Sequence, residues 1–229
     1  MVIQQNRPLG YINLKWAVPA TFGLLMFIQG CVTATVQEVR EAETGITSSE
    51  SIVVLGRSTR PTRQETEEDF VDCVSRNMTG GNISVIQENE FVDAMFPWFE
   101  PRIAPRKTRD LPELINQPMI AARLDEIGLK YLIWIDGNTT RTDAGGSMSC
   151  TITPAGAGCF GFLSWANDSR YEASVWDIRK GTKVGRVSSD ASGTSFMPAV
   201  VIPLPFIARV RAQACTSLAN QLESFIQGS

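Results

Sequence analysis

Side chains able to carry out acid–base or nucleophilic chemistry are few in this chain. The sequence contains no histidine, which removes the commonest general base and the usual partner of a catalytic serine or cysteine. Carboxylates remain, and those around Asp136 and Asp168 are the candidates for a hydrolytic site. Asp136 precedes a glycine, a pair typical of a turn, and Asp168 lies in a polar stretch. We therefore assign no catalytic residue, metal ligand or cofactor.

Cysteine is the other reactive residue, and one of the five cysteines stands apart. Cys31 follows a short apolar run from Trp16 to Ile28, which is preceded by the only early charges, Arg7 and Lys15. A transmembrane helix needs about 20 apolar residues, so this run is too short to be one. A basic start, a short apolar stretch and a small residue before the break are typical of a signal peptide.

The four residues Ile28-Gln29-Gly30-Cys31 resemble the lipobox of bacterial lipoproteins. The resemblance implies that residues 1–30 are a signal peptide and that fatty acids such as palmitate are attached to Cys31. Three acyl chains would anchor firmly, at about 0.8 kcal/mol for each buried methylene. Val32 stands where an aspartate often marks inner-membrane retention, which favours the outer membrane. Cleavage after Ala34, releasing a soluble periplasmic protein, is the alternative.

The four remaining cysteines form an even set, which can pair in three ways. In an oxidising periplasm they are expected to form disulfides. Their spacing favours a bridge across a glycine-rich loop and a second bridge between two expected helices; the pairs are Cys150 with Cys159 and Cys73 with Cys215. The CxxC spacing of zinc sites is absent from the sequence.

The charge balance excludes one class of partner. Without Arg7 and Lys15, the 21 basic residues become 19, against 24 acidic residues, which gives a net charge of −5. Non-specific nucleic-acid binding requires a strongly basic surface, so we expect no nucleic-acid partner. We expect residues 31–50 to be an acylated N-terminus with a flexible linker, and residues 51–229 to fold as a single periplasmic domain.

Two groups of residues are candidates for interaction. The first is the densest positive charge in the chain, which could contact anionic lipid headgroups or an acidic partner; a solvated loop is the alternative. It consists of Arg102, Arg106, Lys107 and Arg109. The second is an aromatic cluster among glycines. If exposed, it would mark a site of contact with a partner or a membrane; the alternative is that the loop folds back and buries the rings against the edge of the sheet. It consists of Phe160, Phe162 and Trp165.

Hydrophobic periodicity predicts an α/β (α+β) fold. We expect a mixed sheet that contains βαβ units, an antiparallel hairpin and a C-terminal helix packed on one or both faces. The expected strands are residues 51–56, 83–87, 130–138, 171–178 and 183–189. The expected helices lie around Phe70 and at 88–95, 118–127 and 206–226. Residues 143–169, with five glycines, and residues 190–205 are expected to be loops.

Several of these segments resemble the periplasmic α/β domain of curli-secretion lipoproteins and the amino-terminal domain of the Tol-system propeller protein. The segments that carry the resemblance are SIVVLG (51–56), the helix around Phe70, ISVIQENEF (83–91), LDEIGLKYLIWIDGNTT (124–140) and SVWDIRKGTKV (174–184). The resemblance implies the fold, and a fold does not fix a function. The curli channel's membrane hairpins need two strands of about 10 residues, and residues 143–169 are too rich in glycine to match them.

The sequence therefore predicts a lipid-anchored envelope protein at the periplasmic face of the outer membrane. It would act as a binding or assembly module with another envelope protein as its partner. One alternative is a periplasmic hydrolase, which requires the carboxylates around Asp136 and Asp168 to converge in a pocket. The other is a subunit of a secretion or pore complex, which requires an oligomer.

Overall fold

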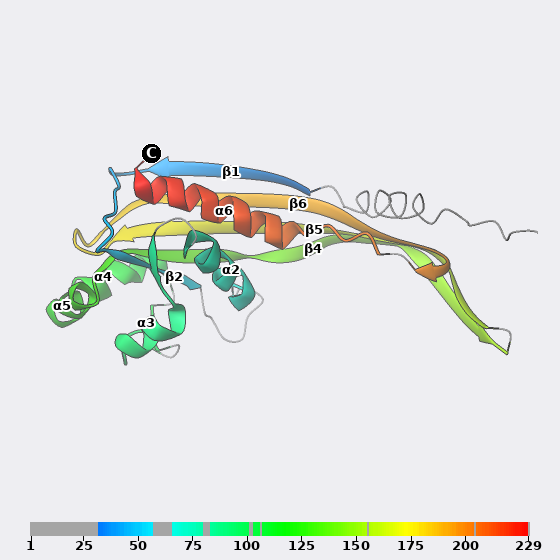
Figure 1. Ribbon diagram of the computed structural model, residues 1–229, viewed down its shortest axis with the longest axis horizontal. Helices are drawn as coiled ribbons and strands as arrows, with labels where there is room; N and C mark the ends of the chain where they lie inside the picture. The colour runs from blue at the N-terminus through cyan, green and yellow to red at the C-terminus, as the bar shows by residue number, and fades with distance from the viewer. Residues whose placement is uncertain are drawn as a thin grey trace, which may run out of the picture.

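The computed structural model describes residues 32–56, 66–79, 83–100, 103–105, 107–154, 156–203 and 205–228. Within these ranges, six strands form one sheet in the order β1-β6-β5-β4-β2-β3 (Figure 1). The strands are β1 (Val32–Arg40), β2 (Ser51–Gly56), β3 (Ser84–Ile86), β4 (Leu129–Thr153), β5 (Gly156–Asp177) and β6 (Thr182–Pro203). The helices are α2 (Glu68–Thr79), α3 (Glu88–Ala94), the 3-10 turn η2 (Thr108–Asp110), α4 (Leu111–Ile115), α5 (Pro118–Glu126) and α6 (Val210–Gln227).

The sheet is mixed, as the sequence predicts. β2 runs parallel to β3 and to β4, whereas β4, β5, β6 and β1 pair antiparallel to one another. β2, α2 and β3 form a βαβ unit, and β5 and β6 are joined by the predicted hairpin turn at Lys180. The α/β fold class is therefore confirmed.

Alternation along β2 divides the core between the two faces of the sheet. Ile52 and Val54 lie in one apolar cluster with residues of α2 and α6. Val53 and Leu55 lie in the other cluster, with residues of α3, α4 and α5. Successive side chains of a strand point to opposite faces, so this β-branched run is buried on both sides. Helices therefore cover both faces of the sheet, with α6 on the side of α2.

A disulfide joins the two helices on the α2 face. Cys73 of α2 and Cys215 of α6 are bonded, with their Cα atoms 6.2 Å apart. Phe70 and Val74 of α2 are buried one turn apart, and Leu218 continues the buried face of α6. The predicted pairing of these two cysteines is confirmed, and it ties together segments that lie 142 residues apart.

The expectation that residues 31–50 form a linker is wrong for residues 32–40. These residues form β1, which pairs antiparallel with β6 from Val32 opposite Gly193 to Arg40 opposite Gly185. Val32 and Val36 also pack against the core. β1 pairs with a strand about 150 residues away and thereby satisfies the backbone hydrogen-bonding groups at the edge of β6. Because this stabilisation comes from a distant segment, the local sequence shows no periodicity that predicts a strand.

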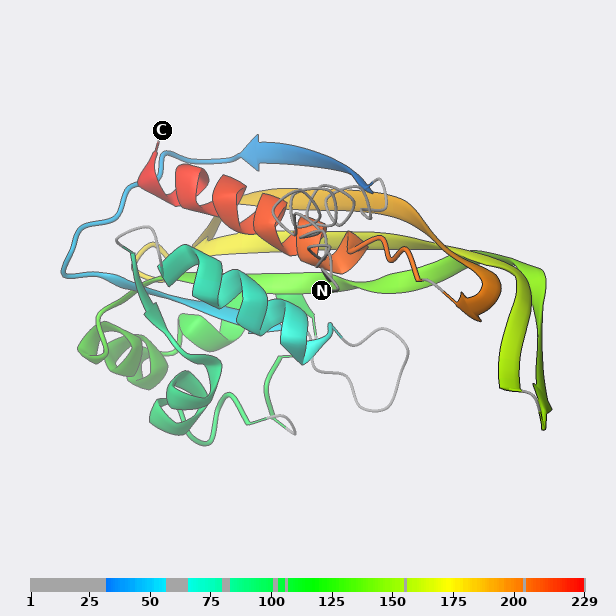
Figure 2. The same ribbon diagram turned by 45° about the vertical axis from the view of Figure 1, so that its right-hand side comes forward.

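The expectation of loops at 143–169 and 190–205 is also wrong. β4 and β5 continue as a paired hairpin to Thr153 opposite Gly156, and β6 follows β5 out to Val201 opposite Cys159. In Figures 1 and 2 these strands extend well beyond the helices and bend near their outer end. The residues around 143–169 therefore form the two long strands that their glycine content argued against.

Two glycines fit these strands because the paired backbones approach closely there. A Cβ at Gly146 would lie 2.1 Å from the carbonyl oxygen of Phe162, and one at Gly161 would lie 2.2 Å from that of Ser147. Both glycines have a positive φ, 92° and 142°, a conformation that other residues adopt only with strain. Glycine here allows the hairpin to form rather than interrupting it.

Candidate functional site

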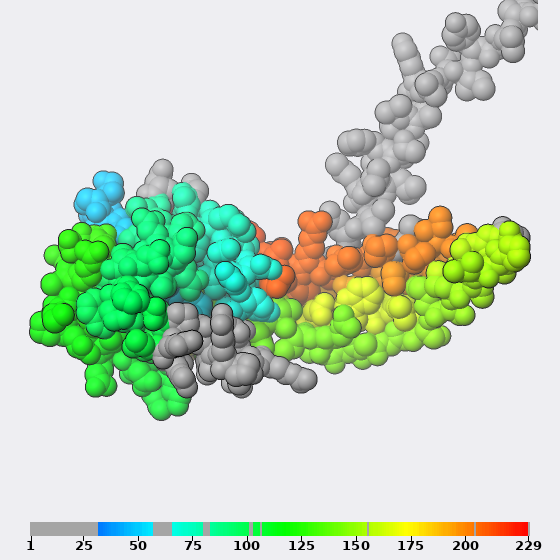
Figure 3. All heavy atoms as spheres, turned by 90° about the horizontal axis from the view of Figure 1, so that it is seen from below, coloured from blue at the N-terminus to red at the C-terminus, as the bar shows by residue number. Residues whose placement is uncertain are grey.

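The most distinctive surface is the three-stranded projection, which we call the arm. It comprises residues 144–153 of β4, 156–167 of β5 and 194–203 of β6. β5 is its central strand, with β4 on one side and β6 on the other. Figure 3 shows the arm as a narrow extension from a wider body.

Large apolar side chains are exposed along the arm. Six of them are between 48% and 89% exposed: Ile152, Phe160, Phe162, Val200, Val201 and Ile202. Soluble proteins scatter such residues singly, and a continuous exposed apolar surface marks a contact site. The arm therefore has the composition of a surface that is covered by something else.

The aromatic residues of the arm lie mainly on one face. Phe160 is opposite Val200, and Phe162 is opposite Pro198, so these residues share a face of the sheet. The ring of Phe162 lies 6.4 Å from that of Phe196, which stacks at 4.9 Å on Phe206. The row of rings runs from the exposed part of the arm back toward the start of α6.

The opposite face of the arm carries its disulfide. Cys150 and Cys159 are directly opposite each other in the ladder and are bonded, with their Cα atoms 4.0 Å apart. This pairing is also as the sequence predicts, although it links two strands rather than closing a loop. Trp165 lies on the same face, half-buried, with the guanidinium of Arg141 6.0 Å from its ring centre. Of the predicted aromatic cluster, Phe160 and Phe162 are thus exposed and Trp165 is partly covered.

The arm carries no charge. Residues 144–167 and 191–208 contain no Asp, Glu, Lys or Arg, although 20% of the chain is charged. At that average, about eight charged residues would be expected in these two segments. The absence of charge from an exposed three-stranded surface is unusual, because charged residues on exposed strand edges are the usual protection against pairing with other chains.

A polar network holds the root of the arm to the body. The hydroxyl of Tyr171 donates to Glu67 at 2.8 Å and lies 2.9 Å from the hydroxyl of Thr139, which is 2.7 Å from that of Ser169. The ring of Tyr171 stacks on Phe70 of α2 at 3.5 Å. Burial raises the pKa of Tyr171 above its usual range, so the phenol remains a hydrogen-bond donor at neutral pH. The network fixes β4 and β5 against α2 at the point where the arm begins.

The carboxylates proposed for a hydrolytic site do not converge. Asp136 is opposite Glu172 in the ladder, whereas Asp168 is opposite Thr140. The two aspartates are therefore separated by four steps along the strands, about 13 Å. Acid–base pairs of glycoside hydrolases have carboxyl groups roughly 5 to 9.5 Å apart. The arrangement gives no support to the hydrolase alternative.

The described members of the basic group lie away from the arm. Lys107 directly precedes η2 and Arg109 lies within it, and both are exposed. The neighbouring helix α4 lies at the opposite end of the molecule from the arm in Figure 1. Arg109 is 3.5 Å from Asp110. Arg102 and Arg106 lie outside the described residues. The structure thus does not bring Lys107 or Arg109 together with the aromatic candidates.

An acidic side chain with a shifted pKa lies where β2 ends. Burial is the main factor that raises the pKa of Glu88, at the start of α3, to about 7, and the charges of Glu68 and Asp72 add to the effect. A backbone hydrogen bond from Gly56 opposes the shift. Across the described part of the chain, no group of three or more Cys, Asp or Glu side chains is placed to bind a metal ion. The raised pKa of Glu88 makes the stability of the folded chain depend on pH.

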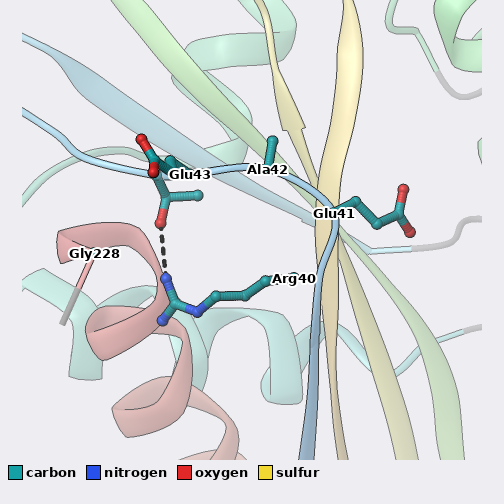
Figure 4. A pocket seen from close by; sticks show the side chains of 6 residues that line it. Arg40, Glu41, Ala42, Glu43 and Gly228 are labelled. Carbon is teal, nitrogen blue, oxygen red and sulfur yellow. Dashed lines mark hydrogen bonds between the residues drawn. The ribbon is translucent and has the colours of Figure 1, made fainter.

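A pocket of about 490 Å³ lies between the end of β1 and the end of α6. Figure 4 shows Arg40 at this pocket with a hydrogen bond drawn from its guanidinium. The guanidinium donates to the hydroxyl of Thr44 at 3.1 Å. Arg40 also donates to the carbonyl oxygen of Phe225 at 3.2 Å and lies 4.6 Å from the ring centre of that residue. The guanidinium of Arg40 thus holds the C-terminal end of α6.

Among the described helices, none is long and apolar enough to cross a bilayer.

Comparison of this chain with known proteins finds similarity to solved structures alone. Neither a protein-family model nor a curated protein matches the chain. Among solved structures, two crystal forms of the PelC dodecamer from Paraburkholderia phytofirmans align with it, each at a TM-score of 0.39 and 12% identity. The alignments cover 86% of this chain and 100% and 99% of the PelC chains. A similarity at this level carries no argument about fold or function.

Proposed function

We propose that this chain is a lipid-anchored protein of the bacterial cell envelope that serves as a binding or assembly module, with the arm as its binding element. In this proposal Cys31 carries the lipid, and the body stands on the periplasmic face of the outer membrane. The observation that carries the proposal is the arm itself, an uncharged projection with exposed aromatic side chains.

Two further observations support an envelope location. Both disulfides join cysteines outside the lipobox, and stable disulfides are typical of oxidising compartments such as the periplasm. The first described residue, Val32, follows Cys31 directly and is already part of the sheet. A lipid on Cys31 would therefore hold the body close to the membrane.

The anchor is tested by Cys31→Ser. Cells fed a radiolabelled fatty acid should label the wild-type protein and leave the variant unlabelled, and the variant should lose its fractionation with outer membranes. Continued labelling of the variant would exclude Cys31 as the acceptor. Val32→Ala is the matched control, because it changes the neighbouring residue and should leave labelling intact.

The binding role of the arm is tested by crosslinking in intact cells. A photoreactive amino acid at Phe162 should give a discrete crosslinked product. The same amino acid at Met119, which is 72% exposed on α5, should give none. Equal products from both positions would show that crosslinking reports exposure only and would contradict the proposal.

The second candidate function is a subunit of a secretion or pore complex. The long β4–β5 hairpin favours it, because curli-secretion proteins, which several segments resemble, have membrane hairpins. This candidate requires a closed oligomer. Native mass spectrometry of protein extracted in mild detergent should then give one multiple of the protomer mass, and a strictly monomeric extract would count against it.

A further inference from the structure

The last charged residues on neighbouring strands lie at one level across the sheet. Asp143 is the last charge on β4, Asp168 the first on β5 after the hairpin, and Asp190 the last on β6. Asp143 is opposite Ala166, and Asp168 is opposite Ser192, so these charges lie within a few residues of one line. Arg170 is bound to Asp190 at 2.8 Å next to this line. The charged surface of the body thus ends abruptly where the arm begins.

The strand that follows the lipobox begins at the same level. Val32, the first residue of β1, is opposite Gly193 of β6, and Gly193 is opposite Asn167 of β5. From Asn167 the central strand continues for about 35 Å to the tip of the arm. A lipid attached next to Val32 therefore enters the membrane beside the charge boundary, and the uncharged arm extends past it.

From this coincidence we infer that the arm is seated in the surface of the lipid bilayer, with its row of aromatic side chains toward the acyl chains. The inference rests on the proposed lipid anchor, and it names the bilayer as the partner of the arm. Aromatic and aliphatic residues gain free energy at the boundary between headgroups and acyl chains, and charged residues do not. The exposed rings of Phe160 and Phe162 and the absence of charge match that environment.

The edges of the arm determine how deep it lies. Among the described residues, the outer edge of β4 has no partner strand beyond Ile135, which is opposite Gly56 of β2. In the same ranges, the outer edge of β6 beyond Gly193 pairs through the bridge of Phe196 with Phe206 alone. Unpaired backbone groups are excluded from hydrocarbon because nothing there accepts or donates hydrogen bonds. A single arm therefore lies at the headgroup boundary, where water reaches its edges.

The arm differs from the basic group in the lipid that it requires. Contact through Lys107 and Arg109 would depend on anionic headgroups. Contact through the uncharged arm should occur equally well with neutral lipid. Neutral vesicles therefore separate the two candidate surfaces.

The test uses the lipidated mature protein in phosphatidylcholine vesicles that contain a lipid with a photoreactive acyl chain. Trypsin releases the arm in two peptides, 142–170 and 187–209, because neither contains an internal Lys or Arg. A third peptide, 110–123, carries the exposed Met119 of the body. After illumination we expect the arm peptides to carry at least tenfold more label than the body peptide. Equal labelling, or an unlabelled arm, would overturn the inference.

A variant pair controls for structure. The double variant Phe160→Asp with Phe162→Asp should lower labelling of peptide 142–170 at least tenfold, whereas Met119→Asp should leave it unchanged. Both side chains are exposed, and an intact disulfide in the non-reduced double variant would show that the arm still folds. Unchanged labelling in the double variant would contradict the inference.

The outcomes separate the inference from the proposed function. Fatty-acid labelling of Cys31 reports on the anchor alone. Lipid on Cys31 with an unlabelled arm would refute the bilayer contact and leave the envelope proposal standing. An unlabelled arm that instead forms crosslinks to a second copy of this chain would assign the surface to self-association and overturn the inference.

Discussion

The two disulfides differ greatly in the length of chain that they close. This difference predicts how much each bridge contributes to the free energy of unfolding. In the chain-entropy model, a bridge restricts the unfolded state by an amount that grows with the logarithm of the loop length. The Cys73–Cys215 bridge spans 142 residues and the Cys150–Cys159 bridge spans 9. The corresponding contributions are about 5 and about 2.6 kcal/mol.

Replacing both cysteines of each pair with alanine should therefore lower the free energy of unfolding unequally. We expect the loss for the helix bridge to be about twice that for the arm bridge. Cys215 is 1% exposed between α2 and α6, so loss of its sulfur also leaves a small cavity and adds to the difference. Urea denaturation followed by circular dichroism measures both losses on protein that lacks the lipid through Cys31→Ser.

The comparison of the two double variants is sharper than either value alone. Native-state strain and residual unfolded structure lower both contributions, whereas their order follows from loop length. An arm variant that loses as much stability as the helix variant would refute the reasoning. It would mean that the arm unfolds together with the body and that its bridge acts through folded-state packing.

Three further predictions concern the body, the arm and the polar network at Tyr171. Glu88 binds its proton more tightly in the folded state, so its contribution to the free energy of unfolding should fall as pH rises from about 4.5 to about 7. Glu88→Gln should remove this fall. The variant should be about 1–2 kcal/mol more stable than the wild type at pH 8 in denaturation titrations. Gly161→Ala should cost about 2 kcal/mol in thermal unfolding because its Cβ meets a carbonyl oxygen, whereas Gly145→Ala, whose Cβ would lie 3.6 Å from its nearest neighbour, should cost less than about 0.5 kcal/mol. Tyr171→Phe should cost about 1–2 kcal/mol and speed amide hydrogen exchange in the adjoining strands; exchange identical to that of the wild type would contradict a holding role.

The body of the fold could be predicted from sequence because its causes are local. The run at 51–56 is β-branched and ends in glycine, and the residues of α2 recur at helical spacing, so each segment carries its own pattern. The two cysteine pairs followed from compartment and spacing. These are the parts where propensity, periodicity and burial agree.

The arm could not be predicted in the same way because its strands depend on partners elsewhere in the chain. Glycine usually weakens a strand, but Gly146 and Gly161 lie where a side chain would collide with the neighbouring backbone. That collision is visible only once β4 and β5 are paired. One signal was available in the sequence, namely the absence of charge from 144–167, which distinguishes the segment from an ordinary solvated loop.

The strand β1 changes what a lipid on Cys31 would imply. A flexible linker of 20 residues would separate its ends by roughly 25 Å and let the body face in any direction. Because Val32 is already paired with Gly193, an anchored body would have almost no linker, and the arm would begin at the membrane surface. The helices α4 and α5, at the far end of the molecule in Figure 1, would then face the periplasm. The membrane should therefore crosslink to positions on the arm such as Phe162, and positions on α5 such as Met119 should give no crosslink to it. Reversal of these two patterns would show that the body is anchored in another orientation.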